Sequence, residues 1–278
     1  MAYVGLRRRR LGRRLAELRK RAGMRQADVV GEFGWSQSSL ARYERGERAP
    51  QRSVMQLLFD LYGVGPDERE ETMNLYRLAE RPSWWYPYRD LIRPEYAAII
   101  DLEADASEIR TYEAIVPGLL QTPAYARQVL RYGAQEIGED EVERRLEVRL
   151  GRQEAFSATD RPRLIAVMDE GALRREVGGR EVMREQVGHL LDMAGEARTT
   201  IQVVPYSAGA NPGAAGGFML LDCEDMRVAY VDTIAGELYL EGASEVRTCS
   251  QAFEQILGFA FSAKDSMSLL HEYLEAYT

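Results

Sequence analysis

Apolar residues recur at helical spacing through the first eighty positions of the chain. The pattern predicts four helices, at residues 26–33, 37–45, 53–62 and about 67–80. Gly34 and Trp35 alone separate the first helix from Ser36, whose hydroxyl is placed to cap the second. Two short helices joined by so tight a turn are typical of a helix-turn-helix.

The helix at 37–45 has two chemically distinct sides. We expect its apolar side to pack against the preceding helix through Leu40, Tyr43, Ala27, Val30 and Phe33. Gln37, Ser38 and Arg42 share the other side. A helix that reads DNA buries one face and presents the other to the major groove, where Gln suits adenine, Arg suits guanine and Ser is permissive. The alternative is an ordinary helical hairpin with a solvated polar face.

Charge is distributed unevenly along the chain. Residues 1–62 carry 14 Lys and Arg against 6 Asp and Glu, a balance of +8, whereas the whole chain has a net charge of −8, which leaves −16 for residues 63–278. Clustered cations are what phosphate neutralisation requires, so we expect the nucleic-acid contacts in the first fifth of the chain. Arg7–Arg10 extend the first helix along phosphates, form an arm that enters a narrow minor groove, or remain a solvated tail.

Composition changes after the predicted head. Within residues 82–94 four aromatic residues, Trp84, Trp85, Tyr86 and Tyr88, line a pocket for a flat ligand or form a contact between domains. We therefore divide the chain into a helix-turn-helix head (1–81), a connector (82–94) and an effector and dimerisation domain (95–278).

The last part of the chain mixes two periodicities. Helices are predicted at 95–112, 123–132, 139–156, 182–194, 245–260 and 264–277. Strands are predicted at 163–168, 200–204, 217–222, 227–232 and 237–240. Thr122 and Pro123 suit the cap and first position of one helix. The pattern predicts an α/β or α+β domain with a mixed sheet of about four or five strands, behind an all-α head.

The sequence contains no recognisable motif for membrane insertion, metal binding, disulfide formation or catalysis. No apolar run of membrane-spanning length and no signal peptide are visible, so we expect a cytoplasmic protein without membrane contact. Two cysteines, Cys223 and Cys249, and two histidines, His189 and His271, have no metal-ligand or disulfide spacing, and we expect buried free thiols. The stretch 209–217 lacks a phosphate-loop signature and is expected to be a turn. Asp169 and Glu170 suit a helix start or acid–base work. We expect no catalytic residue, metal or cofactor.

The segment 23–50 resembles the XRE/Cro/C1-type helix-turn-helix family, a five-helix DNA-binding domain. The matching residues are Gly23, Gln26, Ala27, Gly34, Trp35, Ser36, Leu40, Glu44, Arg45, Gly46 and Pro50. The resemblance implies that Gln26 contacts phosphate, that Gln37, Ser38 and Arg42 face base edges, and that Arg19 pairs with a buried Glu44. The family usually has Thr, Ser or Asn where this chain has Arg25, so a helix cap is lost, and a phosphate contact from Arg25 would offset that loss on DNA.

These considerations assign the remaining contacts. Phosphate contacts are expected from Arg25, Gln26, Ser36, Arg45 and Arg48. Arg45 and Arg48 lie past the second helix, where solvated charges are the alternative.

Residues 84–270 resemble the C-terminal domain of WhiJ-type regulators from Streptomyces and other actinobacteria. The resemblance rests on Trp84-Trp85-Tyr86 and on the segments 109–127, 169–179 and 200–213. It implies a small acidic partner protein and, for some relatives, an antitoxin-like role.

Two functional hypotheses follow. The first is a sequence-specific transcriptional regulator that binds a double-stranded operator as a homodimer, because one head reads only a few base pairs. Its C-terminal domain senses a partner or ligand. The second is an antitoxin-like interaction module that sequesters a small partner protein and binds DNA for autoregulation.

Overall fold

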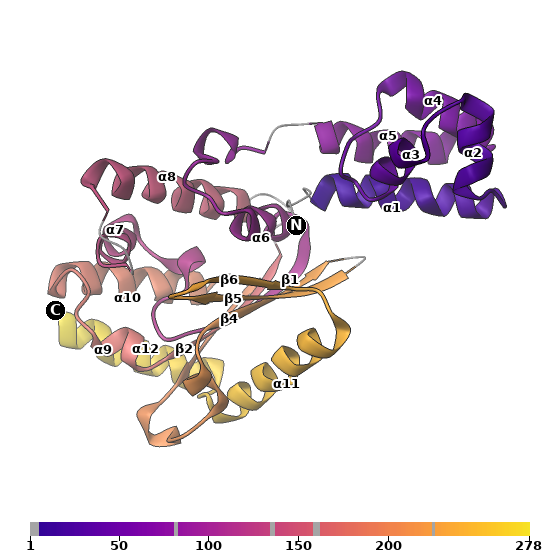
Figure 1. Cartoon of the computed structure of the whole chain (residues 1–278). Helices are drawn as coiled ribbons and strands as arrows, with labels where there is room; N and C mark the ends of the chain where they lie inside the picture. Colours follow the sequence, from indigo (N-terminus) through magenta and orange to yellow (C-terminus); the bar gives the residue numbers. More distant parts are fainter. Residues whose placement is uncertain (1–5, 81–82, 134–136, 158–161, 224–225) are drawn as a thin grey trace. The chain divides into compact units, whose positions relative to one another are not determined.

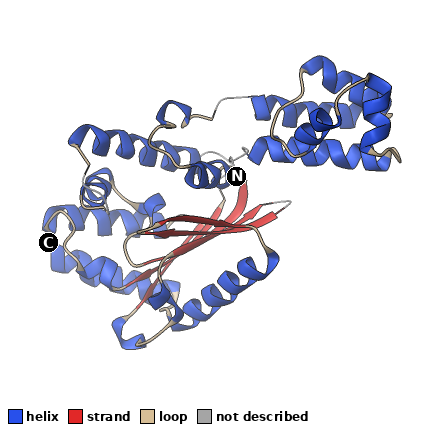
Figure 2. Cartoon of the chain, in the orientation of Figure 1, coloured by secondary structure: helices blue, strands red, loops and turns tan. Residues whose placement is uncertain are grey.

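The chain folds into two compact units, residues 1–86 and 87–278, each described here by itself. The structure is a computed structural model that describes residues 6–80, 83–133, 137–157, 162–223 and 226–278. Unit 1 is built from helices, whereas unit 2 combines helices with strands (Figures 1 and 2). The predicted fold class is thereby confirmed. Arg81 and Pro82, where the predicted head ends and the connector begins, lie outside the described residues.

Unit 1 contains five α-helices in its described part. They are α1 (Leu6–Arg21), α2 (Gln26–Phe33), α3 (Gln37–Glu44), α4 (Arg52–Leu61) and α5 (Pro66–Glu80). Helix α2 has the predicted bounds and α3 ends one residue early. Helix α5 begins at Pro66, because proline at the first helical position has no N–H to leave unsatisfied. Asp67 therefore lies inside the first turn of α5.

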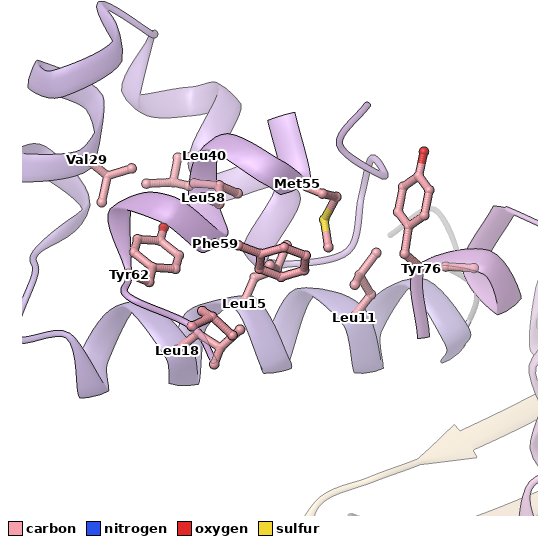
Figure 3. Packing of buried hydrophobic residues seen from close by; sticks show 12 residues of the cluster. Leu11, Leu15, Leu18, Val29, Leu40, Met55, Leu58, Phe59, Tyr62 and Tyr76 are labelled. Atoms are coloured by element: carbon pink, nitrogen blue, oxygen red, sulfur yellow. The ribbon is translucent and has the colours of Figure 1, made fainter. Parts of the chain in front are cut away.

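The core of unit 1 forms where α1 crosses the other helices. Leu11, Leu15 and Leu18 of α1 are buried against Leu40 of α3 and residues of α4 (Figure 3). From α2 the fully buried residue is Val29, whereas Ala27 is exposed, which corrects the expectation for Ala27. Two positions separate these residues, about 200° around a helix, so they cannot face the same core. Val30, Phe33 and Tyr43 are partly buried.

Unit 2 contains the following helices and strands. The helices are α6 (Pro94–Glu103), α7 (Pro123–Arg131), α8 (Glu139–Phe156), α9 (Gly171–Arg174), α10 (Arg180–Ala194), α11 (Ala243–Phe259) and α12 (Ala263–Tyr277). The strands are β1 (Ala106–Glu113), β2 (Arg163–Asp169), β3 (Thr199–Val204), β4 (Phe218–Cys223), β5 (Met226–Thr233) and β6 (Gly236–Leu240). Among the described residues no helix combines the length and the apolar character needed to cross a membrane.

The strands form one mixed sheet of six, in the order β3-β2-β1-β4-β5-β6. Strands β3, β2 and β1 are parallel, and β1, β4, β5 and β6 are antiparallel neighbours. In the β5–β6 ladder Asp232 stands opposite Glu237. The sequence pattern predicted five of these six strands. It missed β1, which lies in the second half of the helix predicted at 95–112.

Charged residues explain why the sequence pattern did not predict β1 as a strand. Arg110 is only 8% exposed, and its guanidinium binds Asp222 at 3.0 Å and Glu254 at 3.3 Å. Glu108, two positions away, adds a third contact at 3.4 Å. Asp222 and Glu254 lie more than a hundred positions away, so the local sequence does not reveal the full set of partners that surrounds this buried charge. The predicted helix is α6 alone and ends at Glu103.

Helices cover both faces of the sheet. Helix α11 packs Phe253 and Ile256 against residues of β1, β4 and β5, such as Leu220. Helix α6 contacts β1, β4 and β6. Helix α8 is fixed to α6 by Arg152, whose Nε lies 2.5 Å from Oε2 of Glu103. In Figure 1, α6 and α8 lie on one side of the sheet and α11 on the other.

Candidate nucleic-acid interface

The turn between α2 and α3 is built by two small residues. Gly34 ends α2 with φ +66°, a left-handed conformation that glycine adopts without steric cost. The hydroxyl of Ser36 accepts a hydrogen bond from the backbone N–H of Ser39 at 3.3 Å. Ser36 is thus the predicted cap of α3. Its hydroxyl also lies 3.0 Å from that of Ser38.

Helix α3 buries one side and exposes the other. Leu40 is 0% exposed and belongs to the core of unit 1. Gln37, Ser38 and Arg42 are all exposed on the other side of the helix. Their side chains can therefore reach a base edge without disturbing the core. Their base contacts themselves stay a prediction.

A buried ion pair fixes the end of α3 to α1. The guanidinium of Arg19 binds the Glu44 carboxylate through two bonds, Nε–Oε1 at 2.5 Å and Nη2–Oε2 at 2.9 Å. The two side chains are 10% and 7% exposed. The hydrogen bond to Glu44 raises the pKa of Arg19. Burial and then the charge of Glu44 raise the pKa of the Tyr62 hydroxyl, which lies nearby.

The same ion pair also positions the start of α2. Nε2 of Gln26 donates to Oε2 of Glu44 at 2.7 Å, and Nη1 of Arg19 donates to the carbonyl of Met24 at 2.7 Å. Glu44 therefore joins α1, α2 and α3 at one point. In this structure the amide of Gln26 is engaged with Glu44, and its expected phosphate contact stays a prediction.

Gly12 and Gly46 allow α1 and α3 to pack closely. Neither residue was expected to be a packing contact. A Cβ on Gly12 would stand 2.6 Å from the carbonyl oxygens of Tyr43 and Glu44. A Cβ on Gly46, which has φ +72°, would stand 2.6 Å from the backbone of Arg8 and Arg9. Backbone lies on both sides of these contacts, so no side chain can move aside. Gly46 belonged to the family pattern, but Gly12 lies in an arginine-rich stretch without any such signal.

Asp28, in the first turn of α2, stabilises the start of the helix, where the side chain of Arg25 makes no cap hydrogen bond. Asp28 accepts from the backbone N–H of Arg25 at 2.7 Å and from its guanidinium at 3.0 Å. These bonds lower the pKa of Asp28, the side-chain bond most. The start of α2 is therefore stabilised without DNA, which corrects the expectation that only a phosphate would offset the loss of the cap.

Glu47 faces two of the arginines assigned to DNA. Its carboxylate lies 2.6 Å from Nε of Arg45 and 3.6 Å from Nε of Arg42. The hydrogen bond to Arg45 is the main cause of the lowered pKa of Glu47. Arg48 is exposed. Any phosphate that binds Arg45 competes with Glu47.

The cations of α1 serve several purposes. Arg7–Arg10 form the first turns of α1, so they extend the helix as in the first of the three alternatives. Arg14 and Arg21 both bind Glu68 of α5, Arg14 through Nη2–Oε1 at 2.6 Å. These two arginines connect α1 to α5 as well as adding to the positive charge of unit 1.

The aromatic residues of the predicted connector differ in exposure. Trp84 and Tyr86 are 38% and 52% exposed, and Trp85 and Tyr88 are partly buried. Whether they bind a ligand or a domain stays a prediction.

The remaining candidates have structural partners. Oδ1 of Asp169 accepts from the backbone N–H of Gly171 at 2.7 Å, at the start of α9. Glu170 accepts from the N–H of Tyr206 at 2.8 Å and the hydroxyl of Tyr273 at 2.9 Å. Burial lowers the pKa of His189. The side chains of Cys223, at the end of β4, and Cys249, in α11, are partly exposed, which corrects the expectation that they are buried.

Comparisons with known proteins identify both units. Residues 10–72 match a family described as a helix-turn-helix domain, which indicates a DNA-binding regulator. Residues 96–272 match a family described as a domain of unknown function, DUF5753. A search of curated proteins gave no match, and neither did a search of solved structures. Because the second match spans more than half of the sequence, the chain belongs to the DUF5753 family, and it carries a helix-turn-helix domain before that region.

Proposed function

We propose that the chain is a sequence-specific transcriptional regulator of the XRE/Cro/C1 type, which reads its operator with α3. One observation carries the proposal. Leu40 and the Arg19–Glu44 ion pair fix the buried side of α3 to the rest of unit 1. Gln37 and Arg42 remain exposed on the opposite side of the helix. A rigidly held helix with an exposed polar face is what major-groove recognition requires.

The exposed residues divide into two roles. Gln37 and Arg42 carry the paired donors and acceptors that distinguish adenine and guanine, so they determine sequence preference, with Ser38 between them. Arg25, Gln26, Ser36, Arg45 and Arg48 contact phosphates. Phosphate contacts position the head on the duplex without sequence information. The net positive charge of residues 1–62 supports this division.

The regulator acts as a homodimer, with dimerisation and sensing in unit 2. The size of one head supports this, because a single short helix contacts few base pairs and two-fold dimers read two half-sites one turn apart. The resemblance to WhiJ-type regulators adds a small acidic partner protein as an input. This partner contacts unit 2, which also carries dimerisation, and the basic unit 1 is left to bind DNA.

In vitro selection tests the proposal. The full chain is incubated with a pool of duplexes that carry a randomised segment, and the bound fraction is sequenced after several rounds. We expect enrichment of one motif with two inverted half-sites about 10 base pairs apart. Enrichment of a single half-site would contradict the dimer and retain the reading of sequence. A bound pool that stays random would overturn sequence-specific recognition.

A further inference from the structure

Unit 2 encloses a cavity that the DNA-binding function does not use. Its volume is about 400 Å³, within the usual range for sites that bind small molecules. The floor is the face of the sheet opposite α11, and the roof includes α8 and the loop 115–121. This loop contains the Pro117-Gly118-Leu119 stretch that formed part of the sequence resemblance.

The sheet side of the cavity carries three carboxyl groups. Glu113 ends β1, and Asp232 and Glu237 face each other across β5 and β6. Burial is the main cause that raises the pKa of each of them, and the charge of Asp232 raises the pKa of the other two. Arg93, which also lines the cavity, lowers the pKa of Asp232 and Glu237. Oε2 of Glu237 is buried and has no hydrogen-bond partner among the described residues. At this end of the cavity, Oε2 of Glu237 is therefore available to accept a hydrogen bond from a ligand.

Helix α8 contributes three arginines to the cavity lining, of which Arg145 pairs with Glu141 on the same helix. Arg152 is paired with Glu103 and also donates to the hydroxyl of Tyr96 at 3.1 Å. Arg149, one turn earlier on α8, donates through Nη1 to the neutral amide oxygen of Gln121. Its Nε is buried without a hydrogen-bond partner within the described part of the chain. Burial, together with the charge of Arg152, lowers the pKa of Arg149.

An arrangement of this kind is costly for an empty cavity. A guanidinium nitrogen buried without an acceptor and a carboxylate oxygen buried without a donor each destabilise the fold. Gly118 lies beside both arginines, since a Cβ there would stand 3.3 Å from Nη1 of Arg152 and 3.8 Å from Nε of Arg149. Apolar side chains, including Val116, Leu130 and Met219, line the space between the two charged ends.

We propose that this cavity binds a small zwitterionic molecule with an apolar body, an amine-bearing carboxylic acid. Its carboxylate accepts from Arg149, and its ammonium group donates to Asp232 and Glu237. The apolar body fills the space between them. Each charged group of the ligand then satisfies one of the unpartnered protein atoms, which a purely cationic or purely anionic ligand cannot do. In the proposed regulator this molecule is the signal that unit 2 senses. Binding in the cavity does not depend on the proposed function, which supplies only its biological purpose.

Calorimetry on the full chain without DNA tests the site, so failure of DNA recognition cannot be confused with failure of this proposal. The probes are the standard α-amino acids, each compared with the amine that lacks its carboxylate and the acid that lacks its amine. We expect apolar amino acids to bind and to raise the melting temperature. Both single-charge counterparts should bind about tenfold or more weakly.

Two variants at opposite ends of the cavity provide the second part of the test. Arg149→Met and Glu237→Gln should each weaken binding of the best amino acid by about tenfold or more. Each variant's fold is checked by circular dichroism, and the two serve as independent tests if one fails to fold. Arg144→Gln is the matched control, because Arg144 lies on the same helix but pairs with Asp90 outside the cavity.

The outcomes separate clearly. Binding that needs both charges of the probe and both protein groups supports the site. A cavity that binds no member of the panel holds water only, and the proposal is overturned. Amines or acids that bind as well as the amino acid would refute the zwitterion, and binding that survives both variants would place the ligand elsewhere.

Discussion

Gly12 on α1 lies so close to Glu44 on α3 that a Cβ would stand 2.6 Å from the Glu44 carbonyl oxygen. The contact joins backbone to backbone, at the same residue whose side chain binds Arg19. The end of the DNA-reading helix is thus held both by an ion pair and by close packing that only glycine permits. The position of α3 depends on a residue far from its exposed face.

Gly12→Ala should destabilise unit 1 by about 1–3 kcal/mol, because the added methyl forces α3 away from α1. All three tryptophans of the chain lie in unit 1, so tryptophan fluorescence during denaturant unfolding of the full chain follows this unit. Gly31→Ala is the control, because Gly31 is helical with no atom within 4 Å of a Cβ. That variant should gain up to about 1 kcal/mol. A Gly12→Ala protein as stable as its parent would refute the close contact.

Glu44→Ala should cost unit 1 about 3–5 kcal/mol, because it leaves Arg19 buried without its counter-charge. Replacing both residues, as in Arg19→Met with Glu44→Leu, should cost less than Glu44→Ala alone, since no stranded charge remains. The same fluorescence measurement decides. Arg21→Met removes one arm of an exposed ion pair with Glu68 and should change stability little. Equal stability of Glu44→Ala and the parent would mean that the pair is solvated.

Glu47→Gln should increase affinity for any duplex by a few-fold. The substitution removes a negative charge that binds Arg45 and neighbours Arg42, so both arginines become available to phosphates. Binding is titrated at several salt concentrations on selected and scrambled duplexes. We expect a similar gain on both and a steeper salt dependence. A gain confined to the selected duplex would instead assign Glu47 to base recognition.

The stability of unit 2 should fall as pH rises towards neutrality. Burial, aided by the charge of Asp232, raises the pKa of Glu113 to about 7, although Arg149, Arg152 and Thr111 act in the opposite direction. The folded state then keeps a proton that the unfolded chain releases above its ordinary pKa of 4.5, so stability is present at low pH and is lost between about 4.5 and 7.

Glu113→Gln should remove the part of this dependence that comes from Glu113, whereas the contributions of Asp232 and Glu237, whose pKa values burial also raises, remain. Above pH 7 the variant should be more stable than the parent by up to about 3 kcal/mol, and near pH 4 the two should be alike. Scanning calorimetry of unit 2 in the full chain across this pH range measures the difference. Parallel stability curves for parent and variant would show that Glu113 is already ionised in the folded protein.

The helix-turn-helix was predictable because its signals are local. Gly34 ends one helix, Ser36 caps the next, and the bounds of α2 follow from residues within one turn of its ends. The polar side of α3 could likewise be read from spacing, because α3 is a regular amphipathic helix. Gly12 could not, because its importance arises only where α1 meets α3.

The sheet and the cavity depended on distant contacts. Strand β1 contains Arg110, whose burial requires Asp222 and Glu254, and local sequence does not indicate such partners. The cavity joins Glu113, Arg149 and Glu237 from three elements widely separated in the sequence. No spacing rule connects such residues before the topology of the sheet is known.

The titration of Arg42→Ala on selected and scrambled duplexes at fixed salt tests the reading of DNA by α3 most directly. We expect a loss of about 1–3 kcal/mol on the selected duplex and little change on the scrambled one, with Gln37→Ala behaving alike. Arg48→Ala is the comparison, because a phosphate contact should weaken both duplexes equally. Equal losses on both duplexes for Arg42→Ala and Gln37→Ala would contradict the assignment of this face to base recognition.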